Sequence, residues 1–284
     1  MIEVVHTIAD VRQRVAAARA AGWRIGFVPT MGALHEGHAS LIRRAVAAGE
    51  YTVVSIFVNP LQFGPGEDFE QYPRTLDADR EVAASCGAHL IFAPSQSEMY
   101  PREQLTFVEV ERLTEGLCGA SRPGHFRGVA TVVAKLFNIV APDTAYFGQK
   151  DAQQAVVIRR MTEDLCMPVR IEVCPIVREP DGLALSSRNA YLDPRERQAA
   201  TVLYRALRAA EAAVLEGERR AETVRQRMLE VLASEPLARV DYAEVVDAAT
   251  LQPLETLRGQ VLLAVAAFVG KARLIDNIVV EVDS

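Results

Sequence analysis

The first 175 residues alternate between short apolar runs and longer stretches in which apolar side chains return every three or four positions. The apolar runs predict buried strands over residues 24–28, 51–58, 88–92, 145–147 and 169–174. The helical spacing predicts a helix that contains Ile8, Val11 and Val15 and ends at Gly22, a helix through Leu41, Ile42 and Val46, and helices over 77–85, 128–140 and 152–165. This alternation favours an α/β fold, in which a doubly wound parallel sheet of the Rossmann-like class carries helices on both faces.

The pattern changes after Pro175. A polar loop leads into a long alanine-rich helix predicted over residues 194–216, and a second helix is predicted over 221–233. Three strand patterns then follow one another closely, over residues 240–246, 261–269 and 274–282. Helices followed by neighbouring strands indicate a small α+β domain with an antiparallel sheet.

A chain of 284 residues is long enough for one large domain or two modest ones. We therefore expect a Rossmann-like domain over residues 1–176 and a smaller α+β C-terminal domain over residues 177–284. The net charge of −6 argues against a nucleic-acid-binding protein, which needs a clustered basic face.

Membrane and secretory classes are also disfavoured by the sequence. The longest apolar run, residues 261–270, is too short to span a bilayer, and the N-terminal residues lack the apolar stretch of a signal peptide. The four cysteines are scattered, without ligand-like spacing to histidine, so we expect free thiols and no metal site. Free thiols fit a cytoplasmic protein, and the short apolar runs predict no contact with a membrane.

A predicted strand-to-helix turn at residues 27–38 carries two of the five histidines of the chain, His35 and His38. Ligands of open α/β sheets bind at the carboxyl ends of strands, where a helix N-terminus offers N–H groups to phosphate. Imidazoles can donate hydrogen bonds there as charge moves onto a leaving pyrophosphate, and Gly32 and Gly37 leave room for a nucleotide. The alternative is a tight turn with two solvent-exposed histidines. The placement of both rings in one such turn favours the functional interpretation.

Two later loops carry groups suited to phosphate. In residues 146–154, Lys150 supplies a mobile positive charge, although an ordinary capped helix would also explain Lys150 and Asp151. In residues 181–189, two hydroxyls stand beside Arg188, and a polar hinge is the alternative.

A fourth polar segment follows the predicted strand at residues 51–58. The amides of Asn59 and Gln62 can donate and accept at once, which suits the hydroxyl, carbonyl and carboxylate groups of a small acid. The glycine-rich, acidic loop at 64–74 is either a lid that excludes water or an ordinary surface loop.

Six ordered segments together resemble one family. They are PTMGALHEGH (29–38), FVNPLQF (57–63), YPRT (72–75), GHFRGV (124–129), FGQKDAQQ (147–154) and LSSRN (185–189). Residues 35–38 resemble the HIGH signature, and residues 185–188 stand in the place of a KMSKS-type signature. By these motifs the chain is similar to the pantothenate synthetase (pantoate–β-alanine ligase) family of the HIGH-motif nucleotidyltransferase superfamily, from its first predicted helix to its last predicted strand.

The resemblance implies an AMP-forming ligase that uses ATP to join (R)-pantoate to β-alanine. It implies a pantoyl-adenylate intermediate, the products pantothenate, AMP and pyrophosphate, Mg²⁺ that arrives with ATP, and a homodimer joined through the larger domain. In each chain the smaller domain would close over the active site. His38 would be the catalytic histidine, and Gln62 and Gln154 would hold pantoate, with Gln62 also meeting β-alanine. The residues implied to bind ATP are Met31, Gly32, Ala33, Leu34, His35, Glu36, Gly37, His38, Gly148, Gln149, Lys150, Asp151, Val177 (through its backbone), Leu185, Ser186, Ser187 and Arg188.

The chain departs from the family pattern at two positions. The third motif lacks the lysine of KMSKS-type loops, so its charge must come from Arg188 together with Lys150. Gln149 stands where family members often carry glutamate, which leaves the role of this position open. For Mg²⁺, Asp77 and Asp79 are candidate ligands, and ordinary acids on a helix surface are an equal alternative.

Two other functions compete with this interpretation. An adenylyltransferase would share the histidine turn but would not need two glutamine-bearing segments for one small acid. A non-catalytic nucleotide-binding regulator would bind ATP without turnover. A dehydrogenase is disfavoured because no G-x-G-x-x-G follows the first predicted strand.

Overall fold

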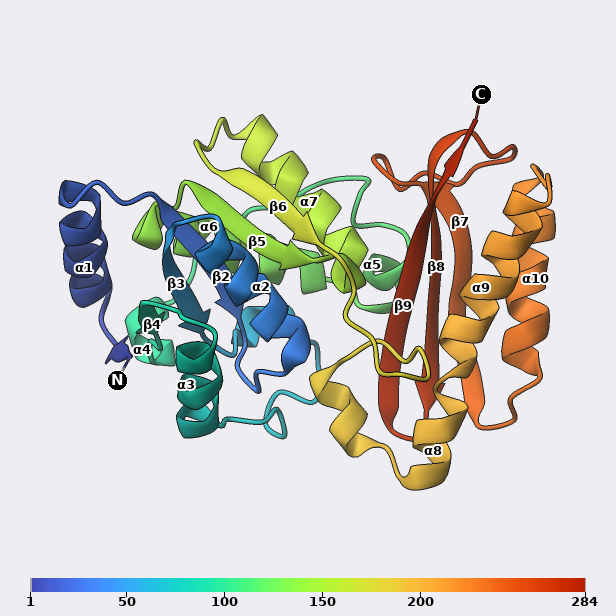
Figure 1. The fold of residues 1–284 in the computed structure, drawn as a ribbon, viewed down its shortest axis with the longest axis horizontal. Coiled ribbons are helices and arrows are strands. Elements are labelled where there is room, and N and C mark those ends of the chain that lie inside the picture. Colours follow the sequence, from blue (N-terminus) through green and yellow to red (C-terminus); the bar gives the residue numbers. More distant parts are fainter. Residues whose placement is uncertain (1, 284) are drawn as a thin grey trace. The chain divides into compact units, whose positions relative to one another are not determined.

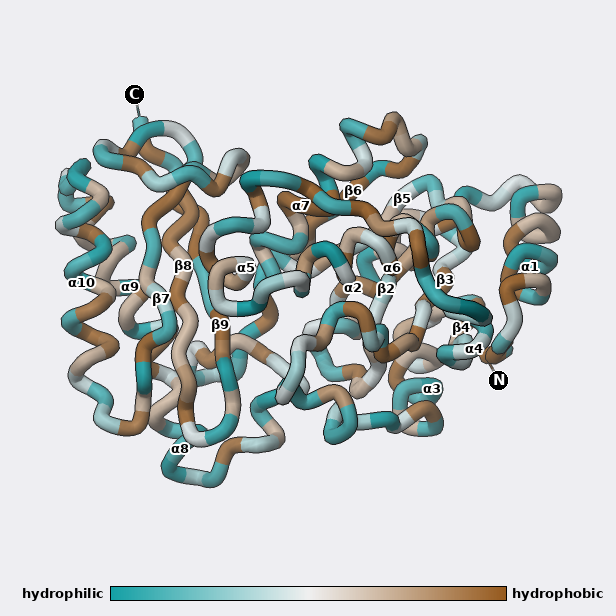
Figure 2. The backbone as a smooth tube through the Cα atoms, turned by 180° about the vertical axis from the view of Figure 1, so that it is seen from behind, coloured by the Kyte–Doolittle hydropathy of each residue, from teal (hydrophilic) through white to brown (hydrophobic). Residues whose placement is uncertain are grey.

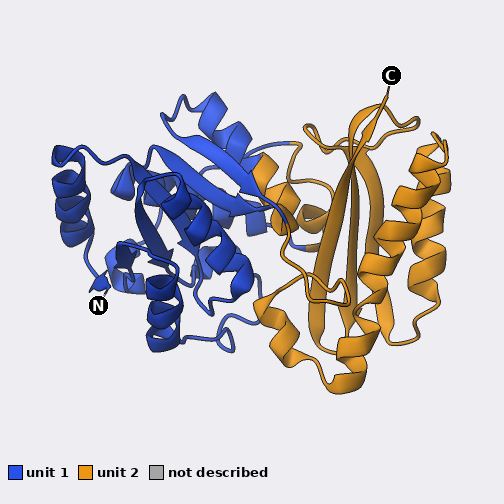
Figure 3. Cartoon of the chain, viewed as in Figure 1, with its two compact units in different colours: residues 1–111, 122–148, 157–175 blue, residues 112–121, 149–156, 176–284 orange. Residues whose placement is uncertain are grey.

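The computed structural model describes residues 2–283, which form two compact units. Unit 1 comprises residues 1–111, 122–148 and 157–175, and unit 2 comprises residues 112–121, 149–156 and 176–284 (Figure 3). Both units draw on separate stretches of the chain. The domain limits expected at residues 176 and 177 stay a prediction.

Unit 1 is built on a six-stranded sheet in which every described strand pair is parallel, in the order β1-β4-β3-β2-β5-β6 (Figure 1). The strands are β1 (Glu3–Val5), β2 (Ile25–Thr30), β3 (Tyr51–Ile56), β4 (Leu90–Phe92), β5 (Thr144–Gly148) and β6 (Arg170–Cys174). From β2 the chain builds β3 and β4 on one side and later β5 and β6 on the other, so the order reverses between β2 and β5. Ligands bind at such a switch point, beyond the carboxyl ends of the strands.

Helices cover both faces of this sheet, which confirms the predicted doubly wound class. On one face Val28 and Tyr146 pack with residues of α2. On the other face the rings of Phe27 and Phe147 lie 6.4 and 6.5 Å from the ring of Phe137 in α6, centroid to centroid. Neighbouring residues of one strand thus serve opposite faces. The helices that contribute to unit 1 are α1 (Ile8–Ala20), α2 (Glu36–Ala47), α3 (Leu76–Ser85), α4 (Gln96–Met99), α6 (His125–Val140), most of α7 (Ala152–Asp164) and the 3₁₀ helix η1 (Pro60–Gln62).

Unit 2 contains the predicted antiparallel sheet, in the order β7 (Ala238–Asp247), β8 (Gly259–Val269), β9 (Ala272–Val282). The central strand β8 is apolar along most of its length (Figure 2). Val261, Leu263 and Val265 belong to the core shared with α9 (Val202–Leu215) and α10 (Ala221–Ala233), whereas Leu262 and Ala264 pack with Leu117 and Ala152 on the other face. The sheet is therefore covered on one face by α9 and α10 and on part of the other face by these residues, whereas Val279 remains exposed. Unit 2 also holds α5 (Cys118–Ser121), α8 (Pro194–Ala199) and the 3₁₀ helices η2 (Gln149–Asp151) and η3 (Ser187–Tyr191).

The structure corrects the predicted elements in three places. The helix predicted over 194–216 is two helices, α8 and α9. At the junction both the N–H and the hydroxyl of Thr201 donate to the Gln198 carbonyl, a local bonding pattern that bends helices. Helix α6 begins three residues before the predicted start, after Gly124 in the left-handed region (φ 81°). Short elements without a periodic pattern, such as β1, α4 and α5, escaped the prediction.

Two further predictions concerned membrane-spanning segments and cysteines. Among residues 2–283, no helix is both long and apolar enough to cross a membrane. All four cysteines are free thiols: Cys86, Cys118 and Cys174 are buried, and Cys166 is exposed in a left-handed conformation after α7 (φ 48°).

Candidate active site

The turn between β2 and α2 places both predicted histidines at the start of α2. His35 is the N-cap: its Nδ1 accepts from the Gly37 N–H at 3.1 Å, and the His38 Nδ1 accepts from the His35 N–H at 3.3 Å. The ring centroids are 4.2 Å apart. Because each Nδ1 accepts, a neutral ring carries its proton on Nε2, the tautomer that can donate to a phosphate oxygen.

Asp79 of α3 holds the same turn through its backbone. The carboxylate accepts from the N–H of Ala33 at 3.1 Å and from the N–H of Leu34 at 2.7 Å. Gly32 has φ 85°, and a Cβ at this position would lie 2.9 Å from Asp79 Oδ2. The turn therefore requires glycine at 32 and an acceptor at 79.

Asp79 is 2% exposed, so the interpretation of this residue as an acid on a helix surface is wrong. Burial raises its pKa, against the opposing effect of the backbone N–H groups of Leu34 and Ala33. Both carboxylate oxygens accept hydrogen bonds from the turn, which explains why an acid is needed at this position. Asp77, the other acid considered for Mg²⁺, is exposed on α3.

Asn59 is a buried amide whose orientation is determined by the backbone. Its Oδ1 accepts from the Leu61 N–H at 3.3 Å, and its Nδ2 donates to the Gly128 carbonyl at 3.1 Å. The hydroxyl of Tyr100 donates to the same Oδ1 at 2.8 Å. Since an N–H can only donate and a carbonyl can only accept, the amide of Asn59 cannot be turned around.

The fixed amide of Asn59 orients Gln62 in turn. Asn59 Nδ2 donates to Gln62 Oε1 at 3.2 Å, so the Gln62 Nε2 points the other way, to the sulfur of Met31 at 2.9 Å. Gln62 is 8% exposed. Gln62, the residue predicted to bind pantoate, therefore offers its Nε2 group as a donor. Through Met31 it also contacts the histidine turn.

The GHFRGV segment, to which the sequence assigned no role, supports the backbone of Gln62. His125 Nδ1 donates to the Gln62 carbonyl at 2.8 Å, and Arg122 Nη2 donates to it at 3.3 Å. Gly128 packs so closely on the segment that a Cβ would overlap the Leu61 carbonyl. Arg122 also pairs with Glu67 at 2.6 Å, which ties the loop at 64–74 to the start of α6.

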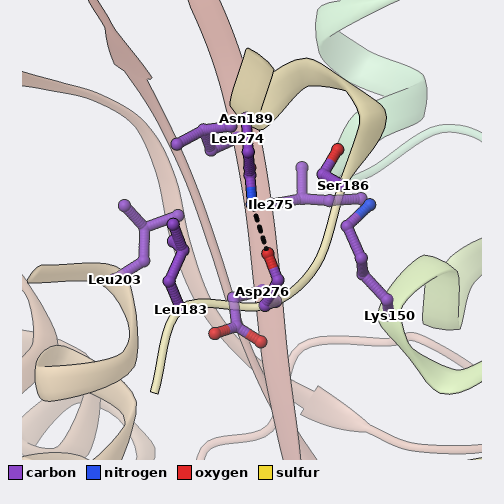
Figure 4. Close-up of a pocket in the computed structure, with 9 residues that line it drawn as sticks. Lys150, Leu183, Ser186, Asn189, Leu203, Leu274, Ile275 and Asp276 are labelled. Atoms are coloured by element: carbon purple, nitrogen blue, oxygen red, sulfur yellow. Dashed lines mark hydrogen bonds between the residues drawn. The ribbon is translucent and has the colours of Figure 1, made fainter. Parts of the chain in front are cut away.

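The remaining predicted residues, apart from Gly148 at the end of β5, lie in unit 2. The Leu185 N–H donates to the Val177 carbonyl at 3.0 Å, and Ser186 caps η3 by accepting from the Arg188 N–H at 3.3 Å. Lys150 and Ser186 line one small pocket that is partly open to solvent, and their side chains extend to the same side of it (Figure 4).

Gln154 is half-buried near the start of α7. Its neighbour Gln153 instead holds the backbone of another segment in place. The Gln153 Nε2 donates to the carbonyls of Leu113 and Gly116 at 2.9 and 2.8 Å. The structure thus gathers the predicted residues into two sets: the turn at 31–38 with Gln62 in unit 1, and residues 149–151 with 177–188 in unit 2. Across residues 2–283, no group of three or more His, Cys, Asp or Glu side chains could hold a metal ion.

Comparison with known proteins extends over nearly the whole chain. The sequence model of the pantoate-beta-alanine ligase family matches residues 3–279. Pantothenate synthetase from Heliobacterium modesticaldum is 64% identical over 261 residues, which are 92% of this chain and 93% of the relative. The crystal structure of pantothenate synthetase from Thermus thermophilus superposes with a TM-score of 0.92 at 47% identity, over 100% of both chains.

A third comparison brings a ligand-bound structure. The pantoate-beta-alanine ligase from Francisella tularensis, complexed with beta-gamma ATP and beta-alanine, has a TM-score of 0.79 at 34% identity, covering 98% of this chain and 97% of that chain. The resemblance seen in the six sequence segments is confirmed. The chain belongs to the pantoate-beta-alanine ligase family.

Proposed function

We propose that this chain uses ATP to condense (R)-pantoate with β-alanine, giving pantothenate, AMP and pyrophosphate through a pantoyl-adenylate. Membership of the ligase family supports the overall reaction. The observation that carries the mechanism is the imidazole pair at the N-terminus of α2, beyond the end of β2, where the strand order of the sheet reverses.

In the first step a carboxylate oxygen of pantoate attacks the α-phosphorus of ATP. The bond from that phosphorus to its bridging oxygen breaks, and pyrophosphate leaves with the electron pair. His38, assisted by His35, donates to the phosphate oxygens as their charge grows, and Lys150 and Arg188 neutralise the triphosphate. The positive dipole end at the start of α2 adds to the same attraction.

In the second step the β-alanine amine attacks the acyl carbon of the adenylate. The bond from that carbon to the phosphate oxygen breaks, AMP leaves, and the amine loses a proton. AMP is a good leaving group, so this step requires mainly proximity, and we assign it no nucleophilic side chain.

Pantoate is held by Gln62 and Gln154. Because Asn59 turns the Gln62 Nε2 outward, Gln62 acts as a donor to an oxygen of pantoate, which would replace the weak sulfur acceptor of Met31. A ligand that presents only donors to this position would leave the Nε2 without an acceptor.

Magnesium enters as part of the substrate, bound to the triphosphate, whose charge it neutralises. We further propose, from family membership, domains at residues 1–176 and 177–284, a homodimer joined through the larger domain, and action in the cytoplasm. Light scattering of the purified protein tests the dimer directly.

The decisive experiment is exchange of labelled pyrophosphate into ATP, with and without D-pantoate. Exchange that requires pantoate supports the first step, and exchange without pantoate contradicts it. Release of AMP should then require β-alanine. An adenylyltransferase would form its nucleotidyl product without β-alanine, and a regulator would bind ATP without either reaction.

A further inference from the structure

Two adjacent polar side chains, Asp276 and Asn277, are buried in the middle of β9. Each is 3% exposed, although nearby residues of the strand, such as Leu274 and Val280, belong to the apolar core. Burial of a carboxylate or an amide is costly unless its hydrogen bonds are satisfied. Neighbouring residues of a strand point to opposite faces, so the two side chains reach different partners.

Asn277 binds the backbone of η2. Its Nδ2 donates to the carbonyls of Gln149 and Lys150 at 2.9 and 3.0 Å. Its Oδ1 accepts from the Gln149 Nε2 at 3.0 Å. All three bonds hold the segment that carries Lys150, so the position of the lysine backbone depends on Asn277.

Asp276 binds the loop that leads to Ser186. Its carboxylate accepts from Arg178 Nη1 at 2.6 Å and from Arg178 Nη2 at 2.9 Å. Arg178 in turn donates to the Gly182 carbonyl at 3.0 Å and lies 4.2 Å above the ring of Tyr204. Gly182 has φ 94°, and a Cβ there would overlap the Tyr204 ring, so the loop is closely packed at this point.

The two anchored segments meet at the cavity lined by Lys150, Ser186 and Asp276 (Figure 4). Asn189, which also lines it, donates to the Ala184 carbonyl at 3.1 Å, the bond drawn in Figure 4. One dipeptide of β9 is thus bonded to both segments, although the whole of α7 and β6 separates these segments along the chain.

We propose that Asp276 and Asn277 are positioning residues that hold residues 149–151 and 178–188 in register with each other, so that Lys150 and the Ser186–Arg188 turn meet one triphosphate. The proposal rests on the proposed function, because that function makes these segments nucleotide-binding. Neither residue touches the reaction itself. They hold the two segments in place before ATP binds, so less conformational entropy is lost on binding.

The same contacts explain Gln149. The Asn277 amide cannot rotate, because two carbonyls hold its Nδ2, so position 149 must offer a donor to Oδ1. A glutamate would set a carboxylate oxygen against that Oδ1. Gln149 is therefore matched to Asn277 in this chain, and its role is to help anchor residues 149–151 to β9.

The test compares Asn277→Asp, Gln149→Glu, the single variants Gln149→Ala and Asn277→Ala, and their double variant Gln149→Ala/Asn277→Ala with wild type. Glu281→Gln, an exposed change on the same strand, is the matched control. Calorimetry measures the Kd of α,β-methylene-ATP, and pyrophosphate exchange gives KM for ATP and for pantoate. We expect Kd and KM for ATP to rise on the order of tenfold in Asn277→Asp and Gln149→Glu, with KM for pantoate within about twofold. The double variant should cost less than the sum of its single changes.

Equal rises in both KM values, or a lower Tm with an unchanged Kd, would overturn the proposal. Gln149 is half-buried, so Gln149→Glu keeps the test valid if Asn277→Asp does not fold. If wild type binds the analogue but shows no pantoate-dependent exchange, the proposed reaction fails, and the analogue affinities still decide for or against the anchor.

Discussion

The backbone N–H of Leu34 donates a hydrogen bond of 2.7 Å to the carboxylate of Asp79, a residue 45 positions later in the chain. Together with the bond from Ala33, this contact shapes the turn that delivers His35 and His38 to the end of β2. A buried acid is thus responsible for the conformation of a segment that sequence alone identifies only by its histidines.

Replacing Asp79 by Asn should loosen this turn. One acceptor oxygen becomes an NH₂ group that faces a backbone N–H, so pantoate-dependent pyrophosphate exchange should fall by roughly 10–100-fold. Because burial raises the pKa of Asp79, its charge is unfavourable in the fold, and the neutral amide should change the free energy of unfolding by only about 1 kcal/mol. As a control, Asp77→Asn changes an exposed residue of the same helix. This variant should catalyse pyrophosphate exchange at the wild-type rate. Full activity in Asp79→Asn would show that the turn does not need this acceptor.

Removing the hydroxyl of Tyr100 should weaken the binding of pantoate without weakening that of ATP. Tyr100→Phe takes away one of the two donors to Asn59 Oδ1, so Asn59 and then Gln62 gain freedom. We expect KM for pantoate to rise about 3–10-fold, since a hydrogen bond of this kind contributes about 1 kcal/mol, with KM for ATP unchanged. A rise in KM for ATP of the same size would argue against this chain of amides.

Truncation of His38 tests the first step. His38→Ala should slow adenylate formation by about 10²–10³ because it removes a donor to the developing charge on phosphate. It also removes the acceptor for the His35 N–H, at a cost of about 1 kcal/mol in stability, which leaves the protein folded. Rapid-quench measurement of pyrophosphate release checks the rate. Normal release would mean that His38 has another role.

His89 should make the stability of the protein depend on pH. Burial lowers the pKa of His89 below its ordinary value near 6.5, and its Nδ1 accepts from the Thr52 N–H at 3.0 Å, which requires the neutral ring. The stabilisation is therefore present above pH 6.5 and is lost as the pH falls below that value, where the unfolded chain binds a proton that the folded protein resists.

Urea unfolding between pH 7.5 and 5 measures this effect. His89→Asn retains an acceptor for Thr52 without a titrating ring, so its free energy of unfolding should decline less steeply with falling pH than that of wild type. If the free energy of unfolding depends on pH equally in the two proteins, His89 is not the source of that dependence.

Regular elements were predictable where apolar residues follow one period. The run at 51–58 became β3 (Tyr51–Ile56), and the pattern at 240–246 became the middle of β7 (Ala238–Asp247). The predicted long helix at 194–216 is interrupted at Thr201, where the backbone N–H and the hydroxyl both bond to the Gln198 carbonyl, and periodicity does not register such a contact.

The site was predictable in its local part. His35 and His38 stand close in sequence, so the capped turn could be anticipated from spacing. Asp79 and Asn277 could not, because their partners are backbone groups 45 and 128 residues away. No local pattern distinguishes such buried polar residues from the surface acids and amides that they resemble.

The accessibility of the thiols has a practical consequence. Cys166 is the exposed one of the four, and the other three are shielded within the part of the chain that spans residues 2–283. A maleimide dye or spin label added to the folded, unmutated enzyme should therefore attach at one known point just beyond α7. A single reporter on the native sequence would allow substrate-induced movements to be followed in solution without engineered cysteines.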